Sequence, residues 1–65
     1  MTTRVQIDYK EFSGVECSEN AKLTFDQIAG GFYVSGVLGC GKTRPTAVQA
    51  ITEYLGGREL IQYQS

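Results

Sequence analysis

One stretch of the sequence has residue types and spacing that could bind phosphate. Residues 36–43, Gly-Val-Leu-Gly-Cys-Gly-Lys-Thr, fit the pattern G-x-x-x-x-G-K-[ST] of nucleotide-binding loops. In such loops backbone N–H groups surround the phosphates, the lysine contacts the outer phosphates and the threonine binds magnesium. One reading of the chain is therefore a nucleotide or phosphate binder through Gly36–Thr43, with anion-binding residues Gly39, Gly41, Lys42 and Thr43.

The surrounding residues argue against nucleotide hydrolysis. Pro45 lies where the following helix would need a backbone N–H, and it disfavours helical geometry at Arg44. Residues 44–65 contain no apolar strand ending in an aspartate that could support magnesium. The parallel sheet that carries such a loop also needs a longer chain. We therefore interpret Gly39 and Gly41 as parts of a tight turn or bulge.

The composition excludes several other classes of function. The chain has no histidine, and hence no imidazole base, no Ser-His or Cys-His pair and no histidine metal ligand. Six basic and seven acidic side chains give a formal charge of -1, which argues against direct binding of nucleic acid or a membrane surface. Cys17 and Cys40 alone cannot complete a structural zinc site. We expect no enzyme activity, metal or cofactor, and either two reduced thiols or one disulfide.

The length and the N-terminal residues bear on organisation and location. Sixty-five residues allow one small domain, residues 1–65. The polar start Met1–Arg4 lacks the apolar core of a signal peptide. No apolar run approaches the roughly 20 residues of a membrane helix. These features predict a single cytoplasmic domain without a membrane partner.

Hydrophobic patterning predicts three strands and two ambiguous segments. Residues 3–10 alternate, with Val5, Ile7 and Tyr9 on one face, and residues 32–38 and 58–63 are also predicted as strands. Residues 12–14 break the first strand, 15–17 could return as a short strand, and 18–20 have turn chemistry. Residues 23–29 fit a strand or a short helix. The helix is slightly favoured by a capping-box spacing and by the two glycines that follow.

The clearest helix is predicted at about residues 46–55. Thr46 and Gln49 have the spacing of a capping box, an apolar stripe follows at helical spacing, and Gly56-Gly57 ends it. Together these elements predict an α+β fold. It consists of a small antiparallel sheet of three to four strands, with this one amphipathic helix packed on one face.

Two groups of side chains are candidates for binding a partner. The acidic residues Glu11, Glu16 and Glu19 lie around the first predicted turn and could meet a basic surface of another protein. Tyr33 and Tyr63 alternate away from their apolar neighbours, so one or both are candidates for exposed anchors. The alternatives are solvated loop charges, incidental surface aromatics, or a sheet face that a second chain covers.

Residues 31–55 resemble the N-terminal segment of HicB-type antitoxins. The shared features are Gly-Phe-Tyr-Val-Ser at 31–35, Leu-Gly-Cys at 38–40, Gly-Lys-Thr at 41–43 and the paired Ala47 and Ala50. The chain lacks the Pro-Asp before the leucine, the residues between Gly-Cys and Gly-x-Thr, and an acidic helix start. It also has no room for the DNA-binding domain of such antitoxins. The resemblance implies a sheet with one helix, a non-catalytic role, and action by binding another protein.

These observations favour a non-catalytic protein-binding module. We expect a small inhibitor that occludes a protein or nucleoprotein complex, of the type that phage or mobile elements encode against host defence, such as anti-CRISPR proteins. The alternatives are a HicB-like antitoxin or regulatory partner and the phosphate binder described above. A homodimer also stays open, because a core this small gains from covering an open face.

Overall fold

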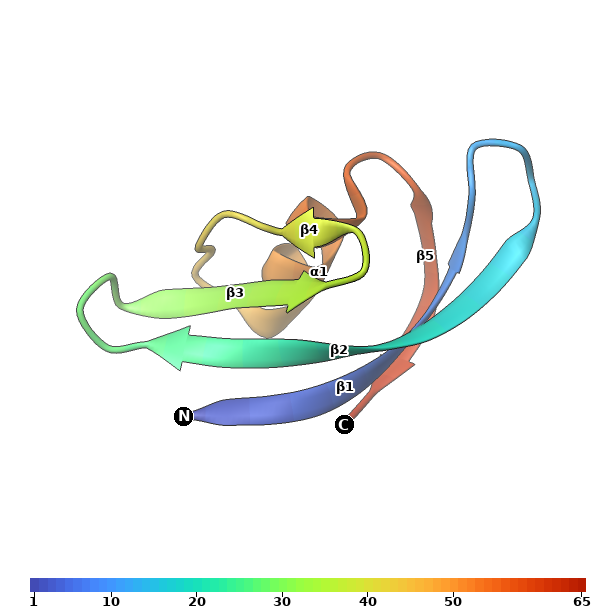
Figure 1. Ribbon diagram of the computed structural model, residues 1–65. Helices are drawn as coiled ribbons and strands as arrows, with labels where there is room; N and C mark the ends of the chain where they lie inside the picture. The colour runs from blue at the N-terminus through green and yellow to red at the C-terminus, as the bar shows by residue number, and fades with distance from the viewer.

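The structure is a computed structural model that describes all 65 residues, Met1–Ser65, as five strands and one helix (Figure 1). The elements are β1 (Thr2–Lys10), β2 (Glu16–Asp26), β3 (Gly31–Gly36), β4 (Gly39–Cys40), α1 (Ala47–Leu55) and β5 (Glu59–Gln64). The strands form one antiparallel sheet in the order β4-β3-β2-β1-β5. The predicted α+β class is confirmed, with five strands in place of three to four. No helix is long and apolar enough to cross a membrane.

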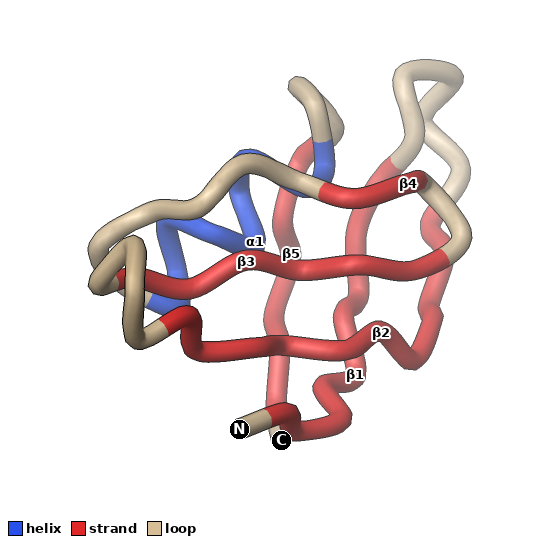
Figure 2. The backbone as a smooth tube through the Cα atoms, turned by 60° about the vertical axis from the view of Figure 1, so that its left-hand side comes forward, coloured by secondary structure: helices blue, strands red, loops and turns tan.

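The sheet is a four-strand meander that gains its fifth strand through α1. The chain runs from β4 along α1 and returns as β5 on the far side of β1. The long strands β1 and β2 bend, so the sheet curves around the helix, which lies against one side only (Figures 1 and 2). The other side of the sheet carries no second layer, and we call it the open sheet face.

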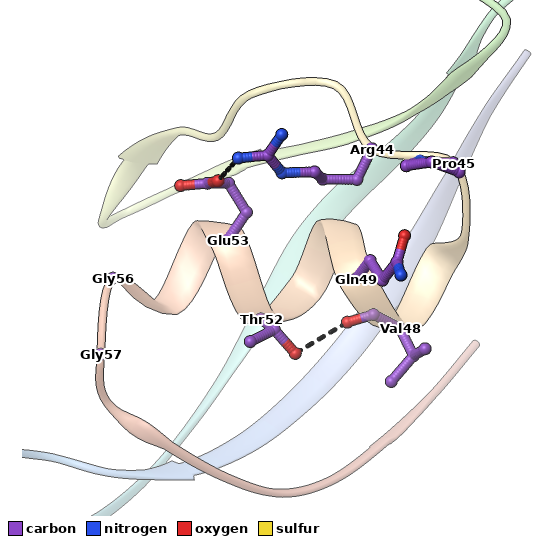
Figure 3. A pocket seen from close by; sticks show the side chains of 8 residues that line it. All are labelled: Arg44, Pro45, Val48, Gln49, Thr52, Glu53, Gly56 and Gly57. Carbon is purple, nitrogen blue, oxygen red and sulfur yellow. Dashed lines mark hydrogen bonds and ion pairs between the residues drawn. The ribbon is translucent and has the colours of Figure 1, made fainter.

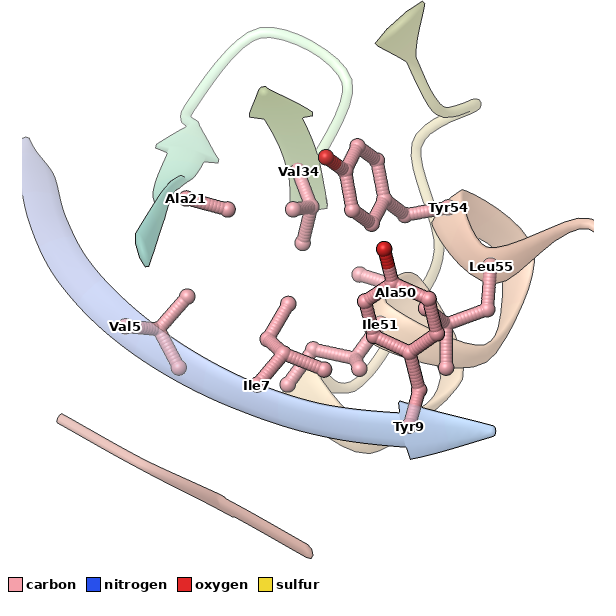
Figure 4. Close-up of a cluster of buried hydrophobic side chains, with 9 residues drawn as sticks. All are labelled: Val5, Ile7, Tyr9, Ala21, Val34, Ala50, Ile51, Tyr54 and Leu55. Carbon is pink, nitrogen blue, oxygen red and sulfur yellow. The ribbon is translucent and has the colours of Figure 1, made fainter. Parts of the chain in front are cut away.

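The core fills the space between the curved sheet and α1 (Figure 4). The predicted alternation of β1 is confirmed, because Val5, Ile7 and Tyr9 are all buried. The predicted helix is confirmed too, since the Thr46 hydroxyl accepts the Gln49 N–H at 3.3 Å and caps α1. Val48 differs from the expected apolar stripe, because its side chain is 45% exposed. The nine buried apolar residues are Val5, Ile7, Tyr9, Ala21, Val34, Ala50, Ile51, Tyr54 and Leu55.

Two predictions in the second strand need correction. Residues 18–20 form no turn, because β2 runs unbroken from Glu16 to Asp26. Of the two alternatives for residues 23–29, the strand is confirmed for residues 23–26, and the slightly favoured helix does not form. The polar side chains at 18–20 stay in the strand because each has a partner or faces solvent. The turn comes instead at residues 27–30, where the Asp26 carboxylate accepts the N–H groups of Ile28 and Ala29 at 3.0 and 3.2 Å.

A bulge in β5 overturns a third prediction. Leu60 pairs with Tyr9 and Gln62 pairs with Asp8, so one extra residue of β5 fits between adjacent residues of β1. Beyond the bulge Tyr63 pairs with Ile7, which is a core residue. Direct partners share a face, so Tyr63 lies on the same face as Leu60, not the opposite one as strict alternation predicts.

Candidate binding surfaces

The three predicted acidic residues do not form one cluster. Glu11 and Glu16 flank the turn between β1 and β2, whereas Glu19 points from β2 toward the helix side. The register places Glu19 opposite Ile7, and Ile7 is fully buried. Only Glu11 and Glu16 therefore belong to the candidate surface around the turn.

Glu19 joins the sheet to the helix. The Tyr54 hydroxyl donates to Glu19 Oε2 at 2.6 Å and accepts the Leu38 N–H at 3.0 Å, while Glu19 Oε1 is buried without a hydrogen-bond partner. Burial and the hydrogen bond to Glu19 raise the pKa of Tyr54 to about 12. Burial, followed by the charge of Glu19, also raises the pKa of Tyr9. This arrangement connects three elements and leaves little of Glu19 for a partner.

The turn between β1 and β2, which we call the β1–β2 tip (residues 11–16), is tightly hydrogen-bonded. The Gly14 N–H donates to the Glu11 carbonyl and the Glu11 N–H donates to the Val15 carbonyl, both at 2.8 Å. Gly14 has φ 92°, which glycine adopts without strain. This is a three-residue hairpin loop closed by a glycine in a positive-φ conformation. The loop holds Phe12 and Val15 outward, 70% and 60% exposed.

The loop after α1 fixes the tip from one side. Arg58 Nε lies 2.5 Å from Glu11 Oε1, and the Arg58 guanidinium lies 5.0 Å from the centre of the Phe12 ring. The same guanidinium donates to the Leu55 carbonyl at 3.1 Å, at the end of the helix. An exposed phenylalanine is therefore held in place by a cation–π contact and an ion pair. Sequence reasoning missed Phe12, Val15 and Arg58, and the only signal for them was an aromatic next to a predicted turn.

The two predicted tyrosines lie on opposite faces of the sheet. Tyr33 pairs with Thr24 on the open sheet face and is half-buried. Tyr63 lies on the helix side near the end of β5, beyond the cover of α1, and is 42% exposed. The two rings do not combine into one surface.

The predicted anion-binding segment follows the edge of the sheet. Gly36 pairs with Gly39 across a two-residue hairpin turn, and Arg44 pairs with Phe32 further along β3. Two of its amides are already used, because the Gly41 N–H donates to the Val34 carbonyl and the Leu38 N–H to the Tyr54 hydroxyl. Helix α1 begins only at Ala47, after Pro45. Lys42 is exposed, Thr43 is half-buried, and neither lies at the start of the helix.

A shallow pocket follows the outer side of α1 (Figure 3). An ion pair between Arg44 and Glu53 spans it, and the Thr52 hydroxyl donates to the Val48 carbonyl at 2.9 Å. Its other lining residues are Pro45, Gln49, Gly56 and Gly57. Arg44 and Glu53 neutralise each other, and Val48 is the one hydrophobic residue of the lining. This surface therefore offers a ligand few unpaired charges and little apolar area. Cys17 and Cys40 are both free thiols elsewhere in the sheet.

Comparisons of this chain with protein-family models, with curated proteins and with solved structures give no match.

Proposed function

We propose that this chain is a non-catalytic protein-binding module that inhibits a larger macromolecular partner by occluding it. The observation that carries the proposal is the β1–β2 tip, where the exposed Phe12 ring contacts the Arg58 guanidinium, which is itself paired with Glu11. Exposed aromatics are frequent anchors of interfaces, and an anchor that is already ordered loses little entropy on binding.

The charges around the tip support the same proposal. Glu16 is exposed beside Val15, whereas the Glu11 carboxylate is paired with Arg58. Exposed apolar side chains beside a free carboxylate suit a cleft with an apolar floor and a basic rim. Nucleic-acid-binding proteins and nucleoprotein complexes offer clefts of this kind, so they are the partner class that we propose.

A matched pair of variants tests the proposal. Phe12→Ser removes the tip aromatic, and Ile28→Ser removes a fully exposed apolar side chain in the turn at the opposite end of β2. Both variants and the unchanged chain are used as bait in lysate of the source organism, with folding checked by circular dichroism. We expect Phe12→Ser to lower the affinity for the captured partner by roughly thirtyfold or more, as for an interface hot spot. We expect Ile28→Ser to leave that affinity unchanged. Equal capture by both variants would refute the role of the tip.

The identity of the captured partner separates the remaining alternatives. A large nucleoprotein complex whose activity falls in proportion to the added protein supports the inhibitor. A small toxin that the chain neutralises would instead support the HicB-like alternative. Heat on titration with ATP and magnesium, abolished by Lys42→Gln, would support the phosphate binder.

A further inference from the structure

The open sheet face carries two cations side by side. Arg4 on β1 and Lys22 on β2 are direct antiparallel partners, and both are exposed. The Cβ atoms of such partners lie about 5 Å apart, and like charges at this position destabilise a sheet. Neither cation belongs to an ion pair, since the ion pairs of the chain are Arg44–Glu53 and Arg58–Glu11. The fold therefore keeps a pair of like charges that it does not neutralise.

The rows of side chains on either side of this pair are neutral and able to form hydrogen bonds. On one side, three amides form a row across three strands: Gln64, Gln6 and Asn20. On the other side, two hydroxyls and an aromatic ring form a row: Thr2, Thr24 and Tyr33. The cation row itself continues onto β3 at Ser35, the partner of Lys22.

Four acidic residues share this face, and none is a direct partner of the two cations: Asp8, Asp26, and Glu16 and Glu59, which pair with Lys10 at the far end of β1. Asp8 is four residues from Arg4 along β1, where it accepts hydrogen bonds from Ser18 and Gln62 at 2.6 and 2.8 Å. Asp26 is four residues from Lys22 along β2, and its carboxylate accepts two backbone N–H groups of the following turn. The net charge of -1 thus conceals a local positive patch.

We infer that this patch binds single-stranded nucleic acid, with Arg4 and Lys22 on the phosphates. Cations supply the sequence-independent part of such binding, and an exposed sheet that combines them with an aromatic ring and polar side chains suits unpaired bases. Tyr33 supplies the ring, and the amide row can form hydrogen bonds to base edges. Two adjacent cations match a short single strand better than the two backbones of a duplex groove. This surface is separate from the β1–β2 tip, so it adds a second contact to the proposed function.

The test is a fluorescence anisotropy titration of a labelled single-stranded oligonucleotide at several salt concentrations. The test variant is Arg4→Gln/Lys22→Gln. The matched control is Lys10→Gln/Arg44→Gln, which removes the same charge from positions beside acidic side chains, since Lys10 pairs with Glu16 and Glu59 and Arg44 with Glu53. With two phosphate contacts, the log of the affinity should fall against log salt with a slope of about -1.4 for the unchanged chain and for the control. The test variant should bind roughly tenfold more weakly at low salt, and its affinity should depend much less on salt concentration.

Further measurements make each outcome decisive. Relief of the charge repulsion should leave the thermal midpoint of the test variant equal to or above that of the unchanged chain. A lower midpoint would show that the two cations serve folding, and would overturn the inference. Absence of binding at low salt, an equal loss in both double variants, or equal affinity for polyglutamate or for duplex would overturn it too.

Discussion

The hydroxyl of Tyr54 on α1 donates a hydrogen bond of 2.6 Å to the carboxylate of Glu19 on β2, 35 positions earlier in the chain. The same hydroxyl accepts the Leu38 N–H from the hairpin that joins β3 and β4. A single oxygen atom therefore connects the helix, the central strand and the edge of the sheet. This group of contacts, and not a turn, is where Glu19 acts.

Replacement of Tyr54 by phenylalanine should destabilise the fold by about 1–3 kcal/mol, because it leaves a partly buried carboxylate and an N–H without partners. The measurement is urea unfolding followed by circular dichroism. Tyr33→Phe is the matched control, since the Tyr33 hydroxyl has no hydrogen bond within the chain, and it should change the free energy of unfolding by less than about 0.5 kcal/mol. Equal effects of the two variants would contradict the role of the Tyr54 hydroxyl.

The alkaline side of the stability profile should depend on Tyr54. Its pKa is about 12 in the folded chain against 10.0 for an unperturbed tyrosine, so the unfolded state loses its proton first as pH rises. The stabilisation from this group is therefore fully present below pH 10 and is lost between pH 10 and about 12. Thermal midpoints measured between pH 9 and 12 should fall more steeply for the unchanged chain than for Tyr54→Phe. Tyr9 keeps part of the slope in both proteins, because its pKa is also raised.

Gly36 allows Tyr54 and Glu19 to meet. A Cβ atom at Gly36 would lie 2.5 Å from Tyr54 Oη and 3.0 Å from Glu19 Oε2, so no larger residue fits without moving them. Gly36→Ala should destabilise the fold by about 1–3 kcal/mol. In the Tyr54→Phe background the closest oxygen is absent, so the cost of the same change should shrink by about 0.5 kcal/mol or more in a double-mutant cycle. Strict additivity of the two changes would contradict this account.

The spacing of apolar and polar residues along the sequence predicted the elements that depend only on neighbouring residues. The alternation of β1 and the capping box at Thr46 are of this kind, and both predictions are confirmed. The errors fall where a distant partner decides. Glu19 and its polar neighbours have the composition of a turn. Their place in a strand depends on the hydrogen bond from Tyr54 to the Glu19 carboxylate, and no residue near Glu19 in the sequence indicates that bond. The bulge that turns Tyr63 to the helix side depends on the pairing of β5 with β1. The alternation of residues within β5 alone therefore cannot predict it.

The candidate surfaces were also predictable only where neighbouring residues in the sequence determine them. The sequence placed Glu11 and Glu16 near a turn, and they do flank it. It could not identify Phe12 as the ordered residue of that turn, because Arg58 comes from 46 positions later in the chain. The pairing of Arg4 with Lys22 was equally hidden, since the net charge counts residues and a register decides which of them are neighbours.

The last prediction concerns what keeps the β1–β2 tip in place. Arg58→Lys retains the positive charge but loses the planar guanidinium that contacts Glu11, Phe12 and the Leu55 carbonyl together. Amide hydrogen exchange at residues 12–15 should therefore speed up, with a global loss of only about 0.5–1.5 kcal/mol. Arg44→Lys is the matched control, because Arg44 pairs with Glu53 on the outer side of α1, away from the tip. It should leave exchange at residues 12–15 unchanged. If Arg58→Lys instead speeds exchange evenly over all strands, Arg58 supports the whole fold and does not preorder the tip.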